Sequence, residues 1–280
     1  MEYAPPSKRA LCARTDGDEA SKPDAGDDGN KVETMTGNWQ SAASILAALS
    51  GFGCFQPPPV MPDERERGTV IMLPGVEGNA WQLKHVYEGL RRAGTDQAIE
   101  IVPWGSPPLS SMQNLTDLKR NRERAGAIAT KIKSLRAEYP DAPLTLIGYS
   151  GGGGLAVLSL EALADGVSVD RTILVAAAIS NRYDVRPLLN KSRDGIVNIY
   201  SKRDGIVGAG TKVFGTIDRR KTLSAGHCGF VNDDHALVDC AGLTQIEWTA
   251  EWRKRGHGGG HLGYLSGDWA EAVLAPLVAE

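Results

Sequence analysis

The sequence lacks the features that mark a chain built to cross a membrane or to bind a polyanion. No apolar run approaches the roughly 20 residues that a membrane-spanning helix needs. The formal net charge of −3 is too small to indicate a nucleic-acid partner or attraction to a membrane surface. The 280 residues, 41% of them hydrophobic, contain no internal repeat and suffice for one sizeable α/β domain or two small ones.

Cysteine is also scarce, with four residues and no Cys-x-x-Cys pair. Cys228 and Cys240 would form a disulfide in an oxidising compartment, or they are two unrelated thiols. His227 and His235 lie near them in the sequence, but the spacing of these four residues matches no known zinc pattern. We therefore expect no metal site.

The first 34 residues are rich in Pro, Gly and Asp and poor in large apolar side chains. They hold eight acidic and five basic residues, so they account for the whole formal charge of −3. Such a composition cannot bury enough apolar surface to fold, and we expect residues 1–34 to be a disordered acidic tail.

Residues 35–67 form a second distinct segment. The stretch Ser41–Cys54 is short, apolar and ends in small residues, and it resembles the hydrophobic core of an export signal. If translation starts at Met35, Cys54 would be the lipid-modified residue of a lipoprotein and would tether the chain to a membrane. The alternative is a short amphipathic helix on a cytoplasmic protein, so the compartment stays open. Pro57–Arg67 is expected to be a polar linker.

From Gly68 onward the sequence alternates between short apolar runs and helical patterns. Buried strands are expected at 69–73, 98–102, 144–147, 171–175, 196–200 and 244–248. This alternation predicts an α/β domain over 68–280, with a mostly parallel sheet and helices on both faces. Asn114 or Thr116 is expected to cap the long second helix, and Asp268 the last one. Functional sites of such sheets form beyond the carboxyl ends of the strands.

One pentapeptide, Gly148-Tyr149-Ser150-Gly151-Gly152, lies between an apolar strand and a run of strong helix formers. It fits the G-x-S-x-G pattern, in which the serine occupies a strained strand-to-helix turn that lifts its hydroxyl clear of the sheet. The flanking glycines are needed because side chains there would collide with the neighbouring strand and helix. Ser150 is therefore the predicted nucleophile.

A serine nucleophile needs a base, an acid that orients the base, and donors for an oxyanion. Of the five histidines, His261 directly precedes the terminal helix and is favoured as the base, with His257 as the alternative. Asp204 follows the strand 196–200 and is the expected acid. The oxyanion donors would be the backbone N–H of Gly151 and that of Val76 or Glu77, in the loop after the first strand.

Residues 68–280 resemble the α/β-hydrolase family. The resemblance rests on the glycine-rich turn and on the order of the three residues along the chain, Ser150, Asp204 and His261. The family usually shows His-Gly where this chain has Pro74-Gly75. Counterparts of the family's first two strands are missing, so the resemblance implies a fold reduced at its N-terminal edge. Only about fifteen residues separate Ile179 from Ile196, too few for a lid domain.

These features together predict a serine hydrolase that cleaves small-molecule carboxylic esters through an acyl-enzyme on Ser150, without a cofactor. Acyl transfer, amide cleavage and thioester cleavage use the same residues and stay open. An inactive member of the family that binds a ligand or partner is the alternative from another class. A dinucleotide-binding module is disfavoured because Gly75-Val-Glu-Gly78 does not fit G-x-G-x-x-G. The oligomeric state is not indicated.

Overall fold

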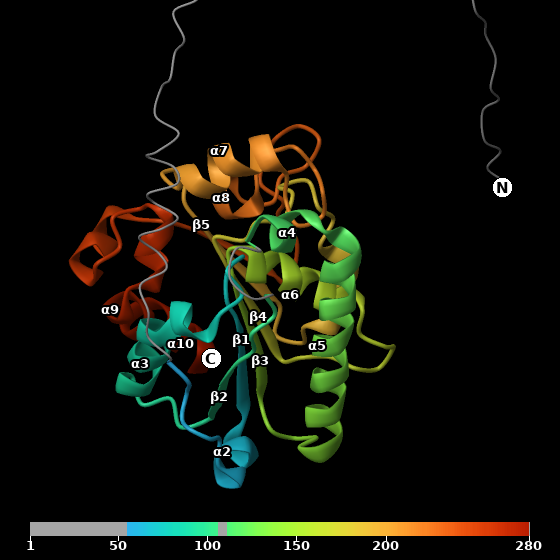
Figure 1. Cartoon of the computed structure of the whole chain (residues 1–280), viewed down its shortest axis with the longest axis vertical. Helices are drawn as coiled ribbons and strands as arrows, with labels where there is room; N and C mark the ends of the chain where they lie inside the picture. Colours follow the sequence, from blue (N-terminus) through green and yellow to red (C-terminus); the bar gives the residue numbers. More distant parts are fainter. Residues whose placement is uncertain (1–54, 106–110, 280) are drawn as a thin grey trace, which may run out of the picture. The chain divides into compact units, whose positions relative to one another are not determined.

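The computed structural model of the chain describes residues 55–105 and 111–279 (Figure 1). The predictions of a disordered tail at 1–34 and of a signal-like segment ending at Cys54 lie outside these residues. No helix of the described part is long and apolar enough to span a bilayer.

A six-stranded sheet forms the centre of the described chain, in the order β2-β1-β3-β4-β5-β6. Every neighbouring pair of strands is parallel. The six predicted strands are all present, three with the predicted bounds and three with ends shifted by one or two residues: β1 (Thr69–Leu73), β2 (Ala98–Ile101), β3 (Leu144–Tyr149), β4 (Arg171–Val175), β5 (Ile196–Tyr200) and β6 (Leu243–Glu247). The α/β fold class predicted from the sequence is confirmed.

Helices cover both faces of the sheet, so both faces are buried. Successive side chains of a strand point to opposite faces and therefore belong to different cores. In β1, Ile71 and Leu73 belong to the core beneath α5 (Leu118–Glu138) and α6 (Gly151–Glu161). Val70 and Met72 belong to the core of the other face. Helices cover that second face too: α3 (Lys84–Arg92), α9 (Gly267–Trp269), a π-type turn (Ala270–Leu274) and α10 (Ala275–Ala279).

The sheet is reduced in the way the sequence predicted. Among the described residues no strand precedes β1. Between β4 and β5 the chain forms only the 3-10 turn η2 (Arg186–Lys191), so this connection holds no lid domain. Instead, segments that follow β5 lie at the carboxyl ends of the strands. They include α7 (Gly205–Phe214) and α8 (Ala225–Cys228), which are seen above the sheet in Figure 1.

The expected linker at 57–67 is only partly correct, because Pro62–Arg67 forms the short helix α2. Proline is well suited to the first helical position, and the Glu64 carboxylate accepts the Met61 N–H at 2.9 Å. Ion pairs then fix α2 on the domain, Arg65 with Glu100 at 2.6 Å and Glu64 with Arg91 at 2.8 Å.

Both predicted helix caps are wrong. Asp117, rather than Asn114 or Thr116, caps α5 by accepting the Arg120 N–H at 3.0 Å. Residues Ser111–Thr116 instead form a separate short helix, α4, and Asn114 is buried. A local sequence pattern cannot distinguish a cap from a polar residue that is buried for another purpose.

At the C-terminal end, Ser266 replaces Asp268 as the cap of α9, whereas Asp268 pairs with Arg92 at 3.0 Å. The helix then widens into the π-type turn, where the Ala275 N–H bonds to the Ala270 carbonyl. Pro276 has no N–H to continue the regular ladder, which accounts for the irregular turn just before it.

One side chain of β6 helps to hold the long segment after β5 to the sheet. Gln245 of β6 accepts the Phe230 N–H at 2.7 Å and donates to the carbonyls of Phe230 at 3.1 Å and Val238 at 3.0 Å. Phe230 is fully buried, so these backbone groups have little access to water. Gln245 thus satisfies two polar groups that would otherwise lose their partners, the Phe230 N–H and the Val238 carbonyl, since the Phe230 carbonyl also accepts the Val238 N–H at 2.9 Å.

We predict that Gln245→Leu lowers the free energy of unfolding by about 1–3 kcal/mol, since an apolar side chain leaves those groups unpaired. Urea denaturation checks this. Thr244→Val, at the exposed neighbouring position of the same strand, is the control and should change stability by less than about 0.5 kcal/mol. Equal stabilities of the two variants would contradict the role given to Gln245.

Candidate active site

Ser150 occupies the turn between β3 and α6 in a conformation that non-glycine residues rarely adopt, with φ 54° and ψ −118°. Two backbone hydrogen bonds hold it there. Its N–H donates to the Val175 carbonyl at 2.9 Å, and its carbonyl accepts the Ala178 N–H at 2.8 Å. The strained strand-to-helix turn expected from the pentapeptide is therefore present.

Two glycines permit this turn. A Cβ atom on Gly148 would fall well inside contact distance of the Gly152 carbonyl, and one on Gly152 would collide with the Leu73 carbonyl. Neither neighbour can move, because both are backbone atoms of central elements. The structure confirms the collision argument made from the sequence.

Three polar side chains meet beyond the carboxyl ends of the sheet. His261 Nε2 lies 2.9 Å from Ser150 Oγ, and His261 Nδ1 lies 2.7 Å from Asp204 Oδ2. Their exposed fractions are 6% for Ser150, 8% for His261 and 0% for Asp204. The Asp204 carboxylate can only accept, so the Nδ1 proton points to it and Nε2 is left to accept the serine proton.

Asp204 has a second role as the N-cap of α7. Its Oδ1 accepts the N–H groups of Ile206 at 3.1 Å and Val207 at 3.2 Å, while Oδ2 faces His261. These bonds and the helix dipole stabilise a carboxylate that has no contact with water. The hydrogen bonds from α7 thereby fix the position of the carboxylate next to His261.

The histidine is positioned by a buried tyrosine. Tyr149 donates its hydroxyl to the His261 carbonyl at 3.2 Å, and the two rings lie 5.0 Å apart. Burial, together with the negative charge of Asp204, raises the pKa of Tyr149 well above its usual value. The hydroxyl therefore keeps its proton and stays a donor. The sequence analysis did not assign this role, although Tyr149 is part of the same pentapeptide.

His257, the alternative base, is part of an aromatic cluster instead. Its ring centroid lies 4.0 Å from that of Tyr264, 5.7 Å from that of Trp252 and 5.7 Å from that of Trp269. Its Nδ1 accepts the Gly259 N–H at 3.2 Å. Burial lowers the pKa of His257 to about 4, so the ring is neutral near pH 7. Of the two histidines, only His261 is brought to Ser150.

The backbones of Val76 and Gly151 face each other beside Ser150. A Cβ atom on Gly151 would lie 3.2 Å from the Val76 nitrogen. Within the described part of the chain, neither of the two N–H groups donates to an acceptor. They are therefore free to bind a negatively charged oxygen. The backbone N–H of Glu77, the alternative to Val76, likewise donates to no acceptor within the described residues, while the Glu77 side chain accepts a hydrogen bond from Gln82 at 2.6 Å.

Three side chains to which the sequence assigned no role in the site hold this loop. Gln82 accepts the Gly75 N–H at 2.6 Å, Trp104 donates its indole N–H to the Pro74 carbonyl at 2.7 Å, and Asn114 donates to the Val76 carbonyl at 2.6 Å. Trp104 and Asn114 are both buried. No short motif signals these contacts, because the three residues come from different elements.

The cysteine and metal interpretations can also be judged. Cys228 and Cys240 are both free thiols, so the disulfide alternative is wrong. His227 donates from Nδ1 to the Asp204 carbonyl at 3.0 Å. No cluster of three or more metal-binding side chains occurs among the described residues.

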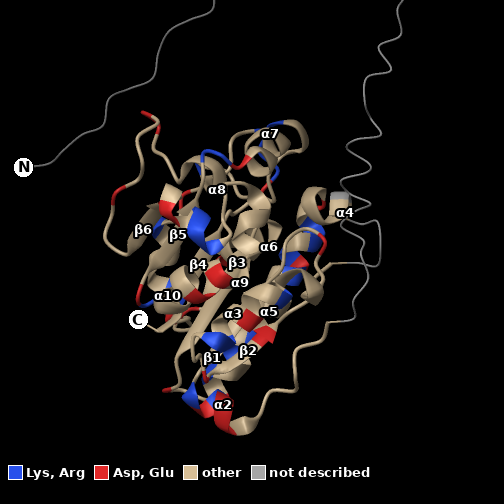
Figure 2. Cartoon of the chain, turned by 90° about the vertical axis from the view of Figure 1, so that its left-hand side faces the viewer, with Lys and Arg blue, Asp and Glu red and all other residues tan. Residues whose placement is uncertain are grey.

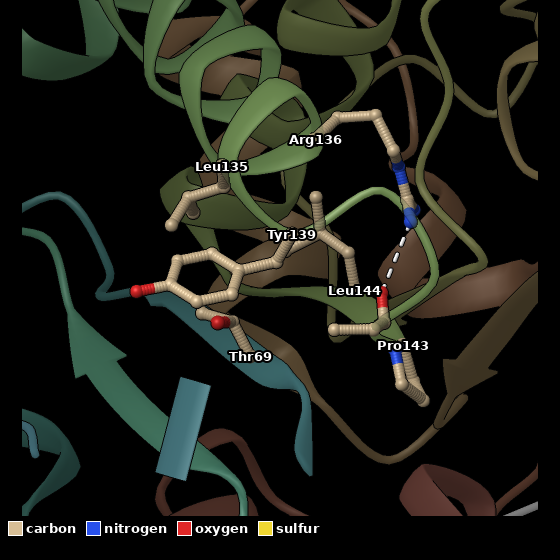
Figure 3. A pocket seen from close by; sticks show the side chains of 7 residues that line it. Thr69, Leu135, Arg136, Tyr139, Pro143 and Leu144 are labelled. Carbon is tan, nitrogen blue, oxygen red and sulfur yellow. Dashed lines mark hydrogen bonds between the residues drawn. The ribbon is translucent and has the colours of Figure 1, made fainter. Parts of the chain in front are cut away.

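A hollow at the opposite end of the sheet cannot serve as the substrate site. It is lined by Thr69 and Leu144, the first residues of β1 and β3, and has a volume of about 10 Å³ (Figure 3). That volume holds roughly one water molecule. Arg136 closes it by donating to the Ala142 carbonyl at 3.0 Å.

The strand order and the strained serine turn define an α/β-hydrolase fold. No protein-family model matches the sequence, and no curated protein matches it. Solved structures with similar architecture include a lipase B from Aspergillus fumigatus, at 16% identity and a TM-score of 0.49, covering 81% of this chain and 56% of that one. This chain thus spans little more than half the length of that lipase.

A lipase-esterase related protein from Clostridium acetobutylicum is also similar, at 10% identity and a TM-score of 0.43, over 79% of this chain and 97% of that one. A Trichoderma reesei cutinase matches at 16% identity and a TM-score of 0.37, over 86% and 87% of the two chains. At these identities the likeness is one of fold, and the chemistry has to be argued from this chain's own residues.

The buried His257 makes stability depend on pH in a specific direction. Its pKa is about 4 in the folded chain and about 6.5 when unfolded, so protonation favours the unfolded state as the pH falls from about 6.5 to 4. We predict that wild type loses about 1–2 kcal/mol more stability than His257→Asn between pH 7 and 4.5, allowing for solvent screening. Urea denaturation of both proteins at the two pH values measures the difference, and parallel losses would contradict it.

Proposed function

We propose that the chain is a serine hydrolase that cleaves carboxylic esters through an acyl-enzyme on Ser150. The observation that carries this proposal is the continuous hydrogen-bond chain from Asp204 through His261 to the Ser150 hydroxyl. A ligand-binding module has no need of a nucleophile, a base and an acid in this order. The expected alternative of an inactive binding protein is therefore disfavoured.

The reaction would proceed in two halves. Ser150 Oγ attacks the ester carbonyl carbon while His261 Nε2 takes its proton, and the negative oxygen of the tetrahedral intermediate is held by the N–H groups of Gly151 and Val76. Collapse of the intermediate breaks the bond to the alcohol oxygen, which receives the proton from His261. Water then attacks the acyl-enzyme in the same manner and releases the acid and the free Ser150.

The environment of the base suits this cycle. The imidazolium formed in each half lies 2.7 Å from the Asp204 carboxylate, which needs no rearrangement because α7 holds its other oxygen. A paired charge in a nearly dry site is far more stable than an isolated one. Every step uses groups of this chain and water.

We predict that Ser150→Ala lowers kcat for a short-chain nitrophenyl ester by at least about 10⁴-fold, because no other group in the site can form the acyl-enzyme. A fluorophosphonate probe should label wild type and leave this variant unlabelled. Ser159→Ala, which removes a buried hydroxyl farther along α6, is the control for a general effect on folding.

Equal turnover by wild type and Ser150→Ala would refute the nucleophile. Amide and thioester analogues of the same acyl group, assayed in parallel, would show which leaving group the site prefers. If all three classes fail with wild type while the probe labels no residue, the inactive alternative is supported.

Asn114 offers a test of the oxyanion loop. We predict that Asn114→Ala lowers kcat by about 10–100-fold with a smaller change in KM, since the freed Val76 carbonyl lets the loop shift and weakens one oxyanion donor. Gln113→Ala, at the exposed neighbouring position of α4, should keep wild-type kinetics. A rise in KM alone would indicate that Asn114 supports substrate binding instead.

A further inference from the structure

The helix that follows the catalytic acid is apolar on both of its faces. Val207 and Thr211 of α7 are buried against the domain. On the outer side, the exposed fractions are 55% for Ile206, 62% for Val213 and 47% for Phe214. A helix on the surface of a water-soluble domain normally carries polar residues on its outer face. The outer face of α7 is thus suited to an apolar environment.

A fourth apolar side chain extends this surface toward the site. Leu262 directly follows His261 in the turn η4 (His261–Leu265), which packs against α7, and it is 50% exposed. We name Ile206, Val213, Phe214 and Leu262 the α7 patch. Four large exposed apolar side chains on two touching elements are a candidate interaction surface, whereas scattered ones would need no explanation.

The charged residues of the segment that contains α7 are mostly basic. Residues 201–221 contain two acids, of which Asp204 is fully buried and Asp218 accepts hydrogen bonds from the Ser180 N–H and the Thr216 hydroxyl. The same residues contain six bases: Lys202, Arg203, Lys212, Arg219, Arg220 and Lys221. Segments coloured blue for Lys and Arg lie beside α7 in Figure 2. The exposed charge here is positive although the whole chain is formally −3.

Four of these bases form no ion pair within the described part of the chain. They are Lys212, Arg219, Arg220 and Lys221. Lys202, by contrast, pairs with Glu247 at 3.0 Å, and Arg203 stacks 5.3 Å from the Trp248 ring centroid. Lys212 and Arg219 are therefore available to an external anionic partner, whereas Arg220 and Lys221 line a hollow that also holds Glu161, Asp184 and Asp218.

We propose that the α7 patch docks on an anionic lipid surface, with its apolar side chains in the headgroup boundary and the surrounding bases on the lipid phosphates. Exposed apolar residues bordered by Lys and Arg are the combination that gives reversible interfacial binding. A protein partner would need a surface complementary both to the α7 patch and to the flexible basic side chains near it. A lipid surface is fluid and can accommodate both. Delivery of lipid esters to Ser150 in this pose rests on the proposed function, but the docking itself does not.

The test uses the full chain carrying Ser150→Ala, so that hydrolysis cannot alter the membrane. It is sedimented with vesicles of phosphatidylcholine alone, or of phosphatidylcholine with roughly one third phosphatidylglycerol. We expect binding to the anionic vesicles that weakens with added salt, because each basic side chain near such a surface strengthens partition about fivefold.

Two variants in the same background locate the contact. Val213→Gln with Phe214→Gln should weaken partition at least about tenfold, and Lys212→Glu about tenfold. The matched controls lie elsewhere, Met61→Gln for an apolar residue that is 57% exposed and Lys133→Glu for an exposed base of α5. Both controls should bind as the parent chain does.

Several results would overturn the proposal. Unchanged binding by both α7 variants would place the contact elsewhere in the chain, and equal binding to both vesicle types would remove the anionic lipid. Concentration-dependent self-association abolished by the double variant would make the α7 patch a contact between copies.

If the double variant lowers the melting temperature, its weaker binding can reflect partial unfolding. The binding of Lys212→Glu, which changes only an exposed charge, then decides whether the α7 patch is the contact. With Ser150 restored, unchanged turnover of a soluble ester by Lys212→Glu separates docking from catalysis.

Discussion

The structure depends on one steric constraint, the close approach of backbone to backbone around Ser150. A strand can turn into a helix within a single residue here because Gly148 and Gly152 carry no side chains and so allow α6 to lie against β1 and β3. The strained φ of Ser150 is the consequence, and it is stabilised by hydrogen bonds with Val175, the last residue of β4, and with Ala178 just after it. The rest of the site is built around a hydroxyl whose position this turn fixes.

Much of the fold was accessible from the sequence because central strands of a parallel sheet are buried on both faces. Runs such as 69–73 and 171–175 have no other reasonable interpretation, and parallel strands place their carboxyl ends at one edge. Once the edge was known, the position of Asp204 after its strand selected it, whereas His261 was favoured over His257 in the same loop. Local chemistry and chain order therefore predicted which side chains meet, and the hydrogen bonds of the structure bring these residues together.

What the sequence could not supply are interactions between elements that are distant in the chain. Asn114 looks like a helix cap in its local context, but its amide binds the Val76 carbonyl, and Asp117 does the capping. His257 looked like a loop residue in a glycine-rich stretch, yet Trp252 and Trp269 enclose it. In each case the deciding partner is a tertiary contact, which no propensity or spacing encodes.

Asp204 joins the proposed catalytic chemistry to the outer surface of the molecule. One of its oxygens orients His261, and the other is bound by the first N–H groups of α7, the helix whose outer face carries the proposed docking residues. A displacement of α7 like that of a lid would withdraw these donors from a fully buried carboxylate and disturb the histidine at the same time. The helix therefore has to act as a fixed platform. Docking through α7 would orient the site toward a surface without any opening step, because the acid and the histidine are already in place.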